Sequence, residues 1–279
     1  MIWRVAGRDI DLSHRGMIMG VLNITPDSFS DGGSFFSLQA AVDHGLALIA
    51  EGADIIDVGG ESTRPGAQPV SEDEELRRVV PAIRALRAKT DCLLSIDTSK
   101  ADVASAALDA GANIVNDITG LRGDPKMHEV AREAGAGVVI MHMQGTPRTM
   151  QAAPSYANVT AEVGDFFRQS IARAISCGLD PMSIALDPGI GFGKTFAHNR
   201  ELLHNLPAFR VWDRPLVVGV SRKSFLGALT GSPALSERFW PGVAMTSFCR
   251  ERGARILRVH DVQPNREALR MTEAILGDA

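Results

Sequence analysis

The stretch LLSIDTSKADVASAALDAGANIV, residues 93–115, contains the repeating unit that decides the fold. Leu93–Ile96 is a short apolar run typical of a buried strand, and Ala101–Ala110 has the apolar spacing expected of a helix. Gly111 stands where a helix can end in a left-handed residue, and Asn113–Val115 begins the next apolar run. The stretch therefore predicts a strand, a helix and a second strand, which is the unit of a parallel sheet.

Similar apolar runs recur along the whole chain, and each is continuous rather than alternating with polar residues. Continuous apolar runs are typical of strands that are buried on both faces of a parallel sheet. The sequence therefore predicts eight strands, which are Ile18–Leu22, Asp54–Val58, Leu93–Ile96, Asn113–Val115, Val138–Met141, Ser183–Leu186, Leu216–Val220 and Arg255–Val259.

Segments with helical spacing separate these runs, and several carry signals for a helix start or end. A hydroxyl before a helix can accept hydrogen bonds from the first backbone N–H groups, and a glycine after it can adopt the left-handed conformation. The predicted starts are Ser37 before Leu38–Ala50, Ser71 with Glu74 before Leu76–Ala88, and Thr98 or Ser99 before Ala101–Ala110. The glycines predicted to end helices are Gly52, Gly111, Gly135, Gly178 and Gly253.

Eight strand–helix units in 279 residues match the size of a (β/α)₈ TIM barrel, and no Pro-rich or Ser-rich linker divides them. We therefore expect an α/β fold with one domain, residues 1–279, in which the barrel spans residues 17–279. Residues 1–16 precede the first unit. In them, Trp3–Val5 and Ile10–Leu12 predict a short N-terminal β-hairpin that covers the bottom of the barrel.

The composition excludes several classes of function. Hydrophobic residues make up 45% of the chain and charged residues 22%, which excludes a disordered or fibrous protein. A formal net charge of −4 gives no basic field for nucleic acid or a membrane surface, and no apolar run approaches the roughly 20 residues of a membrane span. We therefore expect a cytoplasmic protein that binds small molecules. Cys92, Cys177 and Cys249 are set in apolar segments, so we expect buried free thiols rather than disulfides or a metal site.

Polar side chains follow nearly every predicted strand. In a barrel, the carboxyl ends of the strands meet at one face, where active sites are built. One such residue is better explained as a helix cap, but a polar residue after nearly every strand favours a polar pocket. These residues are Asn23, Asp57, Asp97, Asn116, Asp117, His142, Asp187, Ser221, Arg222, Lys223, Arg258 and His260.

Some polar residues also fit a purely structural role. His142 and Asp117 can be orienting partners of their neighbours, and we leave both out of the catalytic set. The remaining histidines that lie in predicted loops or helices are expected at the surface; they are His14, His44, His128, His198 and His204.

Three loops after the predicted strands have compositions that indicate binding. Asn23–Gly33 combines Pro, Gly, Asp and Ser around Phe29, which a plain surface turn does not explain. Gly59–Ala67 places an arginine and two hydroxyls on a glycine-containing backbone, and such groups bind anions. Asp187–Lys194 is rich in glycine and Ser221–Lys223 adds cations, whereas no GxxxxGK[ST] or helix-opening GxGxxG motif is present. The sequence therefore predicts a phosphorylated substrate with a flat heterocyclic ring.

The sequence resembles the dihydropteroate synthases of the folate pathway over nearly its whole length. Met19–Gly33 and Asp57–Gly66 resemble the two signature stretches of that family, and further blocks follow in the family's order. Each block alone is modest evidence, but the ordered set is specific. The further blocks are Ser95–Thr98, Asn116–Asp117, Met141–Pro147, Leu186–Lys194, Ser221–Ser224 and Arg258–Val262.

The resemblance implies condensation of 6-hydroxymethyl-7,8-dihydropterin diphosphate with p-aminobenzoate, which gives 7,8-dihydropteroate and pyrophosphate. It implies that Mg²⁺ assists, that the diphosphate leaves before the arylamine attacks, and that sulfonamides inhibit the enzyme. It also implies a homodimer that the penultimate helix helps to form. The segment Glu237–Ala244, which contains Trp240-Pro241-Gly242, departs from the family's usual start of that helix.

The same resemblance assigns roles to residues by position. The pterin is expected to contact Asp97, Asn116, Met141, Asp187, Phe192, Lys223 and Arg258. The diphosphate is expected to contact Asn23, Thr63, Arg64, Arg258 and His260, and Asn23 is also the expected ligand of Mg²⁺. p-Aminobenzoate is expected to contact Phe29, Thr63, Pro65, Phe192 and Ser221. The residues expected to be catalytic are Asn23, Arg64, Asp97, Lys223, Arg258 and His260.

Two alternatives share part of this pattern. A pterin-binding methyltransferase has the same barrel and pterin acceptors, but it does not need the loop Thr63-Arg64-Pro65 or the cations Arg258 and His260. A pterin-binding relative without catalytic activity is expected to lack Asn23, Asp97, Lys223 or Arg258, and all four are present. An assay for dihydropteroate formation separates the three functions.

Overall fold

The computed structural model describes residues 1–24, 34–62, 66–231, 234 and 236–277, with all side chains except those of residues 34–37, 229 and 230. In these residues, eight parallel strands close into a barrel in the order β10-β3-β4-β5-β6-β7-β8-β9. The barrel and the eight predicted strands are therefore confirmed. The barrel strands are β3 (Met17–Asn23), β4 (Ile55–Gly59), β5 (Leu93–Asp97), β6 (Ile114–Asp117), β7 (Gly137–Met141), β8 (Ile184–Asp187), β9 (Leu216–Val218) and β10 (Ala254–Val259).

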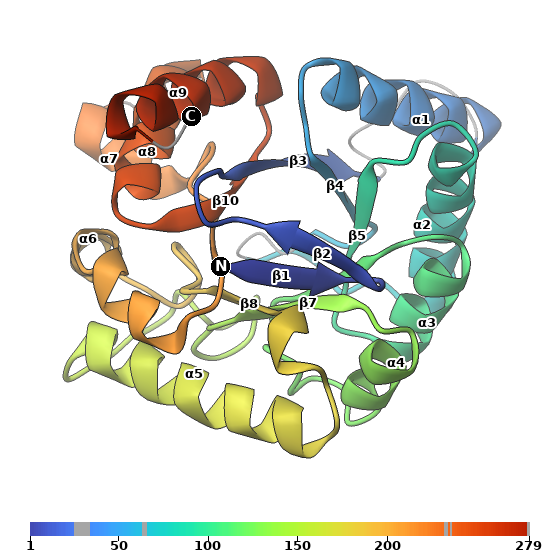
Figure 1. Ribbon diagram of the computed structural model, residues 1–279, viewed down its shortest axis with the longest axis horizontal. Coiled ribbons are helices and arrows are strands. Elements are labelled where there is room, and N and C mark those ends of the chain that lie inside the picture. Colours follow the sequence, from blue (N-terminus) through green and yellow to red (C-terminus); the bar gives the residue numbers. More distant parts are fainter. Residues whose placement is uncertain (25–33, 63–65, 232–233, 235, 278–279) are drawn as a thin grey trace.

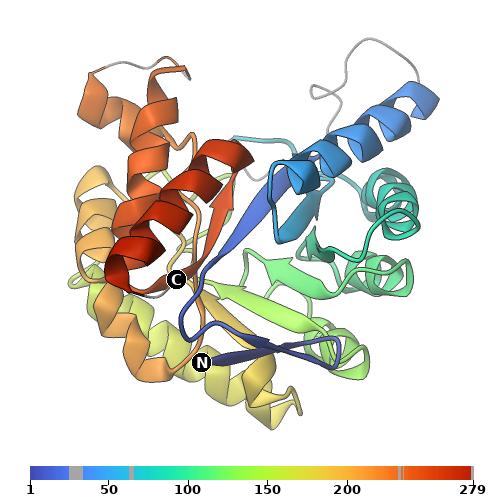
Figure 2. The same cartoon turned by 45° about the horizontal axis from the view of Figure 1, so that its top comes forward.

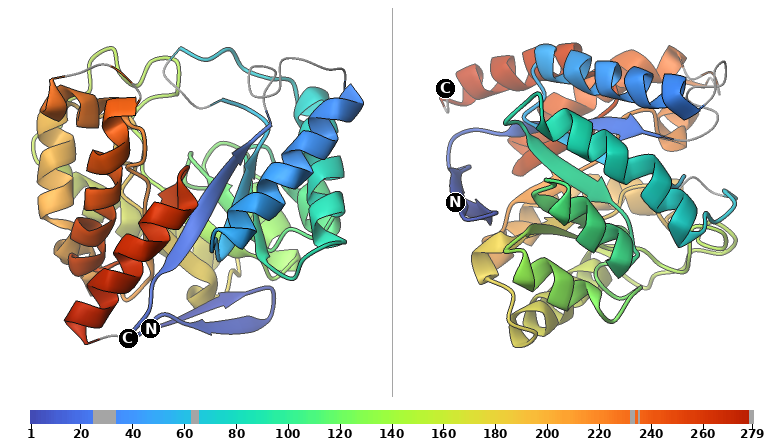
Figure 3. Two further views of the ribbon diagram at one scale, coloured as in Figure 1. Left: turned by 90° about the horizontal axis from the view of Figure 1, so that it is seen from above. Right: turned by 90° about the vertical axis from the view of Figure 1, so that its right-hand side faces the viewer.

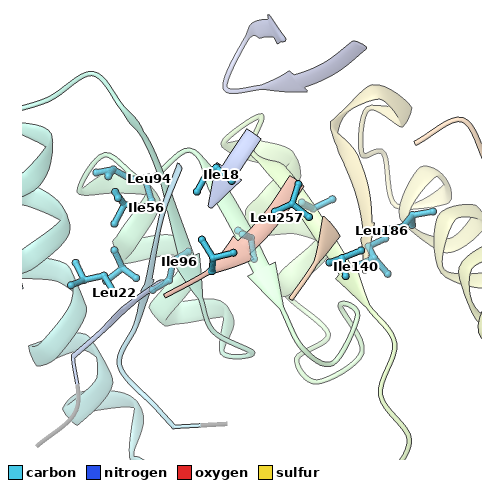
Figure 4. Close-up of a cluster of buried hydrophobic side chains, with 14 of the residues drawn as sticks. Ile18, Leu22, Ile56, Leu94, Ile96, Ile140, Leu186 and Leu257 are labelled. Atoms are coloured by element: carbon cyan, nitrogen blue, oxygen red, sulfur yellow. The ribbon is translucent and has the colours of Figure 1, made fainter. Parts of the chain in front are cut away.

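Helices surround the barrel, as Figure 1 and Figure 2 show from two directions. Their apolar faces pack on the outward side chains of the strands and form the main core; Figure 4 shows part of it, including Ile18, Ile56 and Leu257. The α-helices are α1 (Ser34–Ala50), α2 (Glu72–Arg87), α3 (Ala101–Asp109), α4 (Met127–Glu133), α5 (Val159–Ser176), α6 (Phe196–His204), α7 (Ser224–Thr230), α8 (Phe239–Glu251) and α9 (Val262–Leu276). Short 3₁₀ helices are η2 (Pro181–Ser183), η3 (Leu206–Trp212) and η4 (Ser236–Arg238).

The predicted capping residue is correct for one helix and wrong for two, although α3 begins at Ala101 as predicted. Ser71 caps α2, and its side chain accepts a hydrogen bond from the Glu74 N–H at 3.3 Å. Ser37 lies inside α1, because a serine costs little in a helix and does not by itself mark a start. The cap of α3 is Lys100, and Thr98 Oγ1 accepts from the Lys100 N–H at 3.2 Å in the turn before the helix. All five predicted helix-ending glycines have positive φ, between 58° and 113°.

A two-stranded antiparallel sheet covers one end of the barrel, as the N-terminal residues predict. It consists of β1 (Ile2–Val5) and β2 (Arg8–Asp11), and Figure 3 (left) shows it below the barrel, opposite the carboxyl ends of the strands. Trp3 is fully buried, and its Nε1 donates to the Ser183 carbonyl at 2.9 Å. The hairpin therefore closes the bottom of the barrel with apolar side chains.

The interior of the barrel changes from apolar to polar along the strands. In its lower part the inward residues join Trp3 in a cluster separate from the main core. Two residues further along five of these strands, on the same face, the inward positions are polar. The apolar set includes Ile55, Leu93, Ile114, Ala185 and Ile256, and the residues two positions further on are Asp57, Ser95, Asn116, Asp187 and Arg258. The polar site thus stands on an apolar floor.

Gly137 allows the hairpin to pack against β7. A Cβ at this position would lie 2.8 Å from Val5 Cγ2 and 3.2 Å from Trp3 Cζ2. Gly137→Ala is therefore expected to lower the free energy of unfolding by about 1–3 kcal/mol, measured by urea denaturation. Gly164→Ala is the matched control: Gly164 lies in α5 with open space at its Cβ, so this change is expected to stabilise by about 0.5–1 kcal/mol. Equal effects in the two variants would contradict the packing argument.

Three simpler expectations can also be compared with the structure. The three cysteines are free, and Cys249 is buried, but Cys177 at the end of α5 is exposed because only one face of that helix packs on the barrel. His128 is buried in α4 rather than exposed, on the helix face that packs inward. Among the described residues, no helix is both long and apolar enough to cross a membrane.

Candidate active site

Predicted site residues from three strands, together with Gly59 of a fourth, lie in one row at the carboxyl ends of neighbouring strands. The sheet register pairs Asn23 with Gly59, Gly59 with Asp97, and Asp97 with Asn116. Gly59 leaves space in the row, since a Cβ there would lie 3.5 Å from Asn23 Oδ1 and 3.6 Å from Asp97 Cβ. The amide oxygen of Asn23 and the carboxylate of Asp97 therefore face the same opening.

Arg258 connects this row to the interior of the barrel. Its Nη2 donates to Asp97 Oδ2 at 2.7 Å, and its Nε donates to Asp57 Oδ2 at 2.6 Å. Asn116 Nδ2 donates to the same Asp57 oxygen at 3.0 Å. Asp57 is fully buried and holds two predicted pterin residues in place, although the sequence resemblance assigned it no role. Its position directly after an apolar strand run was the available signal.

Two buried carboxylates share the single guanidinium of Arg258. Burial raises the pKa of Asp97 to about 7; Arg258 opposes this effect and the negative charge of Asp57 adds to it. Burial alone would favour the neutral form of Arg258, but Asp57 and Asp97 together hold its pKa above the usual value. The network therefore keeps a permanent cation next to a carboxyl group that can change protonation near neutral pH.

The raised pKa of Asp97 predicts a pH dependence of stability. The folded protein binds the Asp97 proton more tightly than the unfolded chain, so this group stabilises the fold most at low pH. That stabilisation is lost as the pH rises from about 4 to about 7, by at most about 1.4 kcal/mol per pH unit. Urea denaturation between pH 4.5 and 8 should show the wild type losing stability relative to Asp97→Asn. Parallel curves for the two proteins would contradict the prediction.

Asp187, at the end of β8, and Lys223, in the loop between β9 and α7, form a second pair of opposite charges. Asp187 Oδ1 accepts the Gly189 N–H at 2.7 Å; burial raises the pKa of this carboxyl, and Lys223 opposes the rise. Burial lowers the pKa of Lys223 to about 8, with Asp187 acting in the opposite direction. Lys223 Nζ donates to the Ile190 carbonyl and lies 4.6 Å from the centre of the Phe192 ring. The pair thus places one acceptor and one donor beside an aromatic face.

Apolar side chains line one side of this region. Met141, at the end of β7, belongs to a small buried cluster against which Phe192 packs, as expected if the two form walls of one pocket. The other members of the cluster are Ile118, Met143 and Met150.

His260 and Ser221 meet where β10 and the loop after β9 lie side by side. Ser221 Oγ lies 3.2 Å from both the backbone nitrogen and the ring Nδ1 of His260. Next to them, Arg222 forms an ion pair with Asp261 at 2.5 Å and adopts a left-handed φ of 60°. The structure therefore brings together the predicted diphosphate and p-aminobenzoate residues of these two strands.

The second loop, Gly59–Ala67, is anchored on the side that precedes the residues that are not described. The Gly60 carbonyl accepts from Arg78 Nη1 at 2.8 Å, and Lys100 Nζ donates to Glu61 Oε2 at 2.5 Å and to Glu75 on α2. Lys100 was not predicted, because only the folded loop brings it to Glu61. The predicted site residues Phe29, Thr63, Arg64 and Pro65 lie outside the described residues.

The hydrogen bonds of Asp117 agree with a structural role, in which it orients its neighbours. Its buried carboxylate accepts the Thr119 N–H at 2.7 Å and the Leu121 N–H at 3.0 Å, so it caps its own loop. His142 is also buried, and it lies beside Lys194.

A cavity of about 700 Å³ lies beside the site rather than over it. The loops after β6 and β7 and the first turns of α5 line it, with Arg122, Gln144 and Phe166 among the lining residues. None of the predicted site residues that the structure describes lines this cavity. We therefore define the site by the hydrogen-bonded groups at the strand ends and not by this cavity.

The donor set fits a magnesium ion that the substrate helps to hold. Within the described part of the chain, no three His, Cys, Asp or Glu side chains are grouped as ligands for a metal ion. Asn23 presents an amide oxygen at the opening, and Mg²⁺ usually takes few protein oxygens together with phosphate oxygens and water. The residues present therefore fit an ion shared with a diphosphate better than a closed protein site.

Comparison with known proteins agrees with this geometry. Residues 19–260 match the family described as pterin binding enzyme. The chain is 48% identical over 271 residues to the dihydropteroate synthase of Escherichia coli (strain K12), covering 97% of this chain and 95% of the relative. The chain belongs to the dihydropteroate synthase family. The family resemblance seen in the sequence is thereby confirmed.

Solved structures of dihydropteroate synthases have the same fold. The Yersinia pestis enzyme in complex with a sulfonamide drug is 44% identical and superimposes with a TM-score of 0.92, covering 100% of both chains. The Xanthomonas albilineans enzyme with 4-aminobenzoic acid is also 44% identical, with a TM-score of 0.92 and 99% of both chains covered. The barrel and its order of strands are thus those of this enzyme family.

Proposed function

We propose that this dihydropteroate synthase joins 6-hydroxymethyl-7,8-dihydropterin diphosphate to p-aminobenzoate and releases pyrophosphate. The observation that carries the proposal is the arrangement of charges at the mouth of the barrel. Arg258 is bonded to Asp57 and Asp97, and Asp187 and Lys223 stand at the ends of the strands on its other side. Donors and acceptors so arranged suit a flat ring that carries both kinds of group.

The pterin ring would lie across these groups with its hydrogen-bonding edge toward β8. Asp187 would accept from the 2-amino group and N3–H, and Lys223 would donate to O4 and N5. Asn116 and Asp97 would meet the N1 and N8 side of the ring. The burial of these four groups supports this proposal, because hydrogen bonds to charged groups are strongest where water is excluded.

The faces of the ring would be covered by a cation and by apolar groups. The guanidinium of Arg258 would stack on one face of the ring. Its two carboxylate partners, Asp57 and Asp97, hold the guanidinium at a fixed angle. Met141 and Phe192 would provide the apolar walls, since both belong to the cluster beside Asp187. A flat aromatic ligand is thus the shape that the pocket favours.

The diphosphate would lie at the opening, above β3 and β10. Asn23, Thr63, Arg64, Arg258 and His260 would hold its oxygens. Asn23 would also hold Mg²⁺, which when bound would neutralise charge on the diphosphate. The structure describes three of these residues, Asn23, Arg258 and His260. They stand at the ends of adjacent strands, which supports the proposal.

The chemical step would be a dissociative substitution. The C–O bond to the diphosphate breaks, its electron pair leaves with the oxygen, and the ring delocalises the positive charge at the exocyclic methylene. The p-aminobenzoate nitrogen then forms the new C–N bond and loses a proton. Arg258 and His260 would stabilise charge on the leaving group, and the Asp97 carboxylate would stabilise the cationic ring. No residue needs to form a covalent bond with the substrate.

p-Aminobenzoate would bind between Phe192 and Ser221 on one side and the residues Phe29, Thr63 and Pro65 on the other. We therefore predict that sulfonamides inhibit the enzyme competitively with p-aminobenzoate; the Yersinia pestis relative with a sulfonamide drug supports this. Steady-state kinetics at several p-aminobenzoate concentrations tests it: the apparent inhibition constant should rise linearly with p-aminobenzoate. Inhibition that excess p-aminobenzoate does not relieve would reject this assignment.

A homodimer would form through the helices that follow β9 and β10. Helices α8 and α9 pack side by side, and they leave apolar side chains exposed: Trp240 is 71% exposed, Met271 66% and Ile275 80%. Exposed apolar residues gathered on neighbouring helices support an interface between subunits.

One assay tests the proposed function against its alternatives. The protein is incubated with the dihydropterin diphosphate, Mg²⁺ and labelled p-aminobenzoate, and the products are separated. Dihydropteroate and pyrophosphate in equal amounts are expected. Binding of the pterin without product would favour a pterin-binding protein that lacks catalytic activity. In a parallel incubation that contains a methylated pterin and a corrinoid, methyl transfer to the corrinoid would favour the methyltransferase.

A further inference from the structure

A buried lysine that the proposed mechanism does not use lies behind the pterin residues. Lys194 follows the glycine-rich loop after β8, and it is only 3% exposed. Its Nζ lies 3.0 Å from the Phe192 carbonyl, 3.0 Å from His142 Nδ1 and 3.3 Å from the His142 carbonyl. Burial lowers the pKa of Lys194 to about 7; in its protonated form the group has three N–H donors, and here each donor has one acceptor. Lys194 is therefore fully bonded and has no donor left for a substrate.

The three acceptors belong to two different segments. His142 follows β7, and its N–H donates to the Asp187 carbonyl at 2.9 Å; Phe192 lies in the loop after β8. Lys194 thus ties the end of β7 to the loop that begins at Asp187. His142 accepts at Nδ1, so its proton lies on Nε2; burial, and then the charge of Lys194, lower the pKa of His142 to about 3.

The loop that Lys194 holds carries or contacts the predicted pterin groups. The Gly189 N–H donates to Asp187, the Ile190 carbonyl accepts from Lys223, and the Phe192 ring faces Lys223. The loop packs tightly on β7, since a Cβ at Gly189 would lie 1.9 Å from the His142 carbonyl oxygen. A change in the path of this loop would therefore shift several pterin contacts together.

We infer that Lys194 is a positioning residue for the pterin site, and that it acts through its hydrogen bonds to Phe192 and His142. This inference rests on the proposed function, which assigns Asp187, Phe192 and Lys223 to the pterin. Lys194 itself touches no substrate. It fixes the loop so that the pterin contacts are already in place when the ligand arrives.

The test compares two substitutions at this position in the full-length protein. Lys194→Met removes all donors, whereas Lys194→Gln keeps N–H donors without the charge. Lys89→Met, at an exposed position outside the site, is the control. Calorimetry with 6-hydroxymethyl-7,8-dihydropterin should show binding weakened at least tenfold in Lys194→Met and partly restored in Lys194→Gln. Pyrophosphate with Mg²⁺ should bind all variants within twofold of wild type, because its residues lie on other strands.

A second measurement reports on the hydrogen bond itself. NMR titration should show the pKa of His142 rising toward its usual value in Lys194→Met, since a neighbouring positive charge has been removed. A lysine that only stabilised the fold would lower pterin and pyrophosphate binding together, or neither, after correction for the folded fraction. Should the methionine variant not fold, Lys194→Gln decides: a partial loss of pterin affinity with unchanged pyrophosphate binding supports positioning, and pterin affinity equal to wild type overturns it.

Three results would overturn the inference. The first is unchanged pterin affinity in folded Lys194→Met. The second is an equal loss in the glutamine and methionine variants, which would point to the charge felt by Asp187 rather than to the hydrogen bonds. The third is a parallel loss of pyrophosphate binding. Failure of the proposed function would be seen in the wild-type protein, which would then not bind the dihydropterin or form product. Failure of the inference would be seen only in the variants.

Discussion

Asp187→Asn is expected to weaken binding of the dihydropterin by at least about tenfold. One oxygen of Asp187 is already engaged by the Gly189 N–H at 2.7 Å. Asparagine keeps one acceptor for that bond, so its NH₂ group would face the N–H donors of the pterin. Losing a charge-assisted hydrogen bond and burying two opposed donors costs about 2–4 kcal/mol.

Titration calorimetry with the dihydropterin measures this effect directly. Asp54→Asn is the matched control, because Asp54 is a partly buried carboxylate at the opposite end of the barrel, bonded to the Ile18 N–H and Arg266. It should affect stability but not the affinity for the pterin. Unchanged affinity in Asp187→Asn would remove Asp187 from the pterin site.

Arg258→Met is expected to lower the free energy of unfolding by about 3–5 kcal/mol and to abolish detectable activity. The change leaves Asp57 and Asp97 buried near each other without their shared cation. Removing one partner of a buried ion pair is costly because the remaining charges are not solvated. Arg258 opposes the rise in the pKa of Asp97, so without it this carboxyl group binds its proton more tightly in the folded protein, and protonation relieves part of the cost at low pH.

The sign of the pH effect separates this explanation from simple loss of packing. The destabilisation of Arg258→Met should be larger at pH 8 than at pH 5, as measured by urea denaturation. Arg250→Met is the control: Arg250 is buried even more completely than Arg258 and is paired with Glu273 at 2.9 Å, between α8 and α9. It should lose stability but keep the catalytic rate per folded molecule. An Arg258→Met effect that is independent of pH would show that the two carboxylates do not carry the cost.

The strands were predictable from the sequence because parallel barrel strands are apolar on both faces. An apolar run as short as Val138–Met141, placed between two helical segments, is explained only by a buried strand. Helix starts were less predictable: Ser37 has the residue type of a cap but lies inside α1. A hydroxyl residue favours a cap only where the backbone already turns, and the sequence does not specify that turn.

The site was predictable as a set of strand ends but not as a network. Asp57 and Arg258 are 201 residues apart, and only the closed register of β10, β3 and β4 brings them together. The change from apolar Ile55 to charged Asp57 along one face of the strand is visible in the sequence. The ion-pair partner of Asp57 is not. Lys194 was harder still, because its acceptors include two backbone carbonyls, and any residue type supplies those.

The hairpin that closes the barrel has a consequence for how the chain is made. Trp3 and Val5 pack against side chains as distant as Val217 and Ile256, so their docking site is incomplete until β10 exists. Ribosomes add roughly 5–20 residues per second, so the hairpin waits on the order of tens of seconds for its partners. An isolated two-stranded hairpin is barely stable in water. The hairpin is synthesised before these partners but is therefore among the last parts of the barrel to reach its native place, and Trp3 stays accessible to chaperones until then.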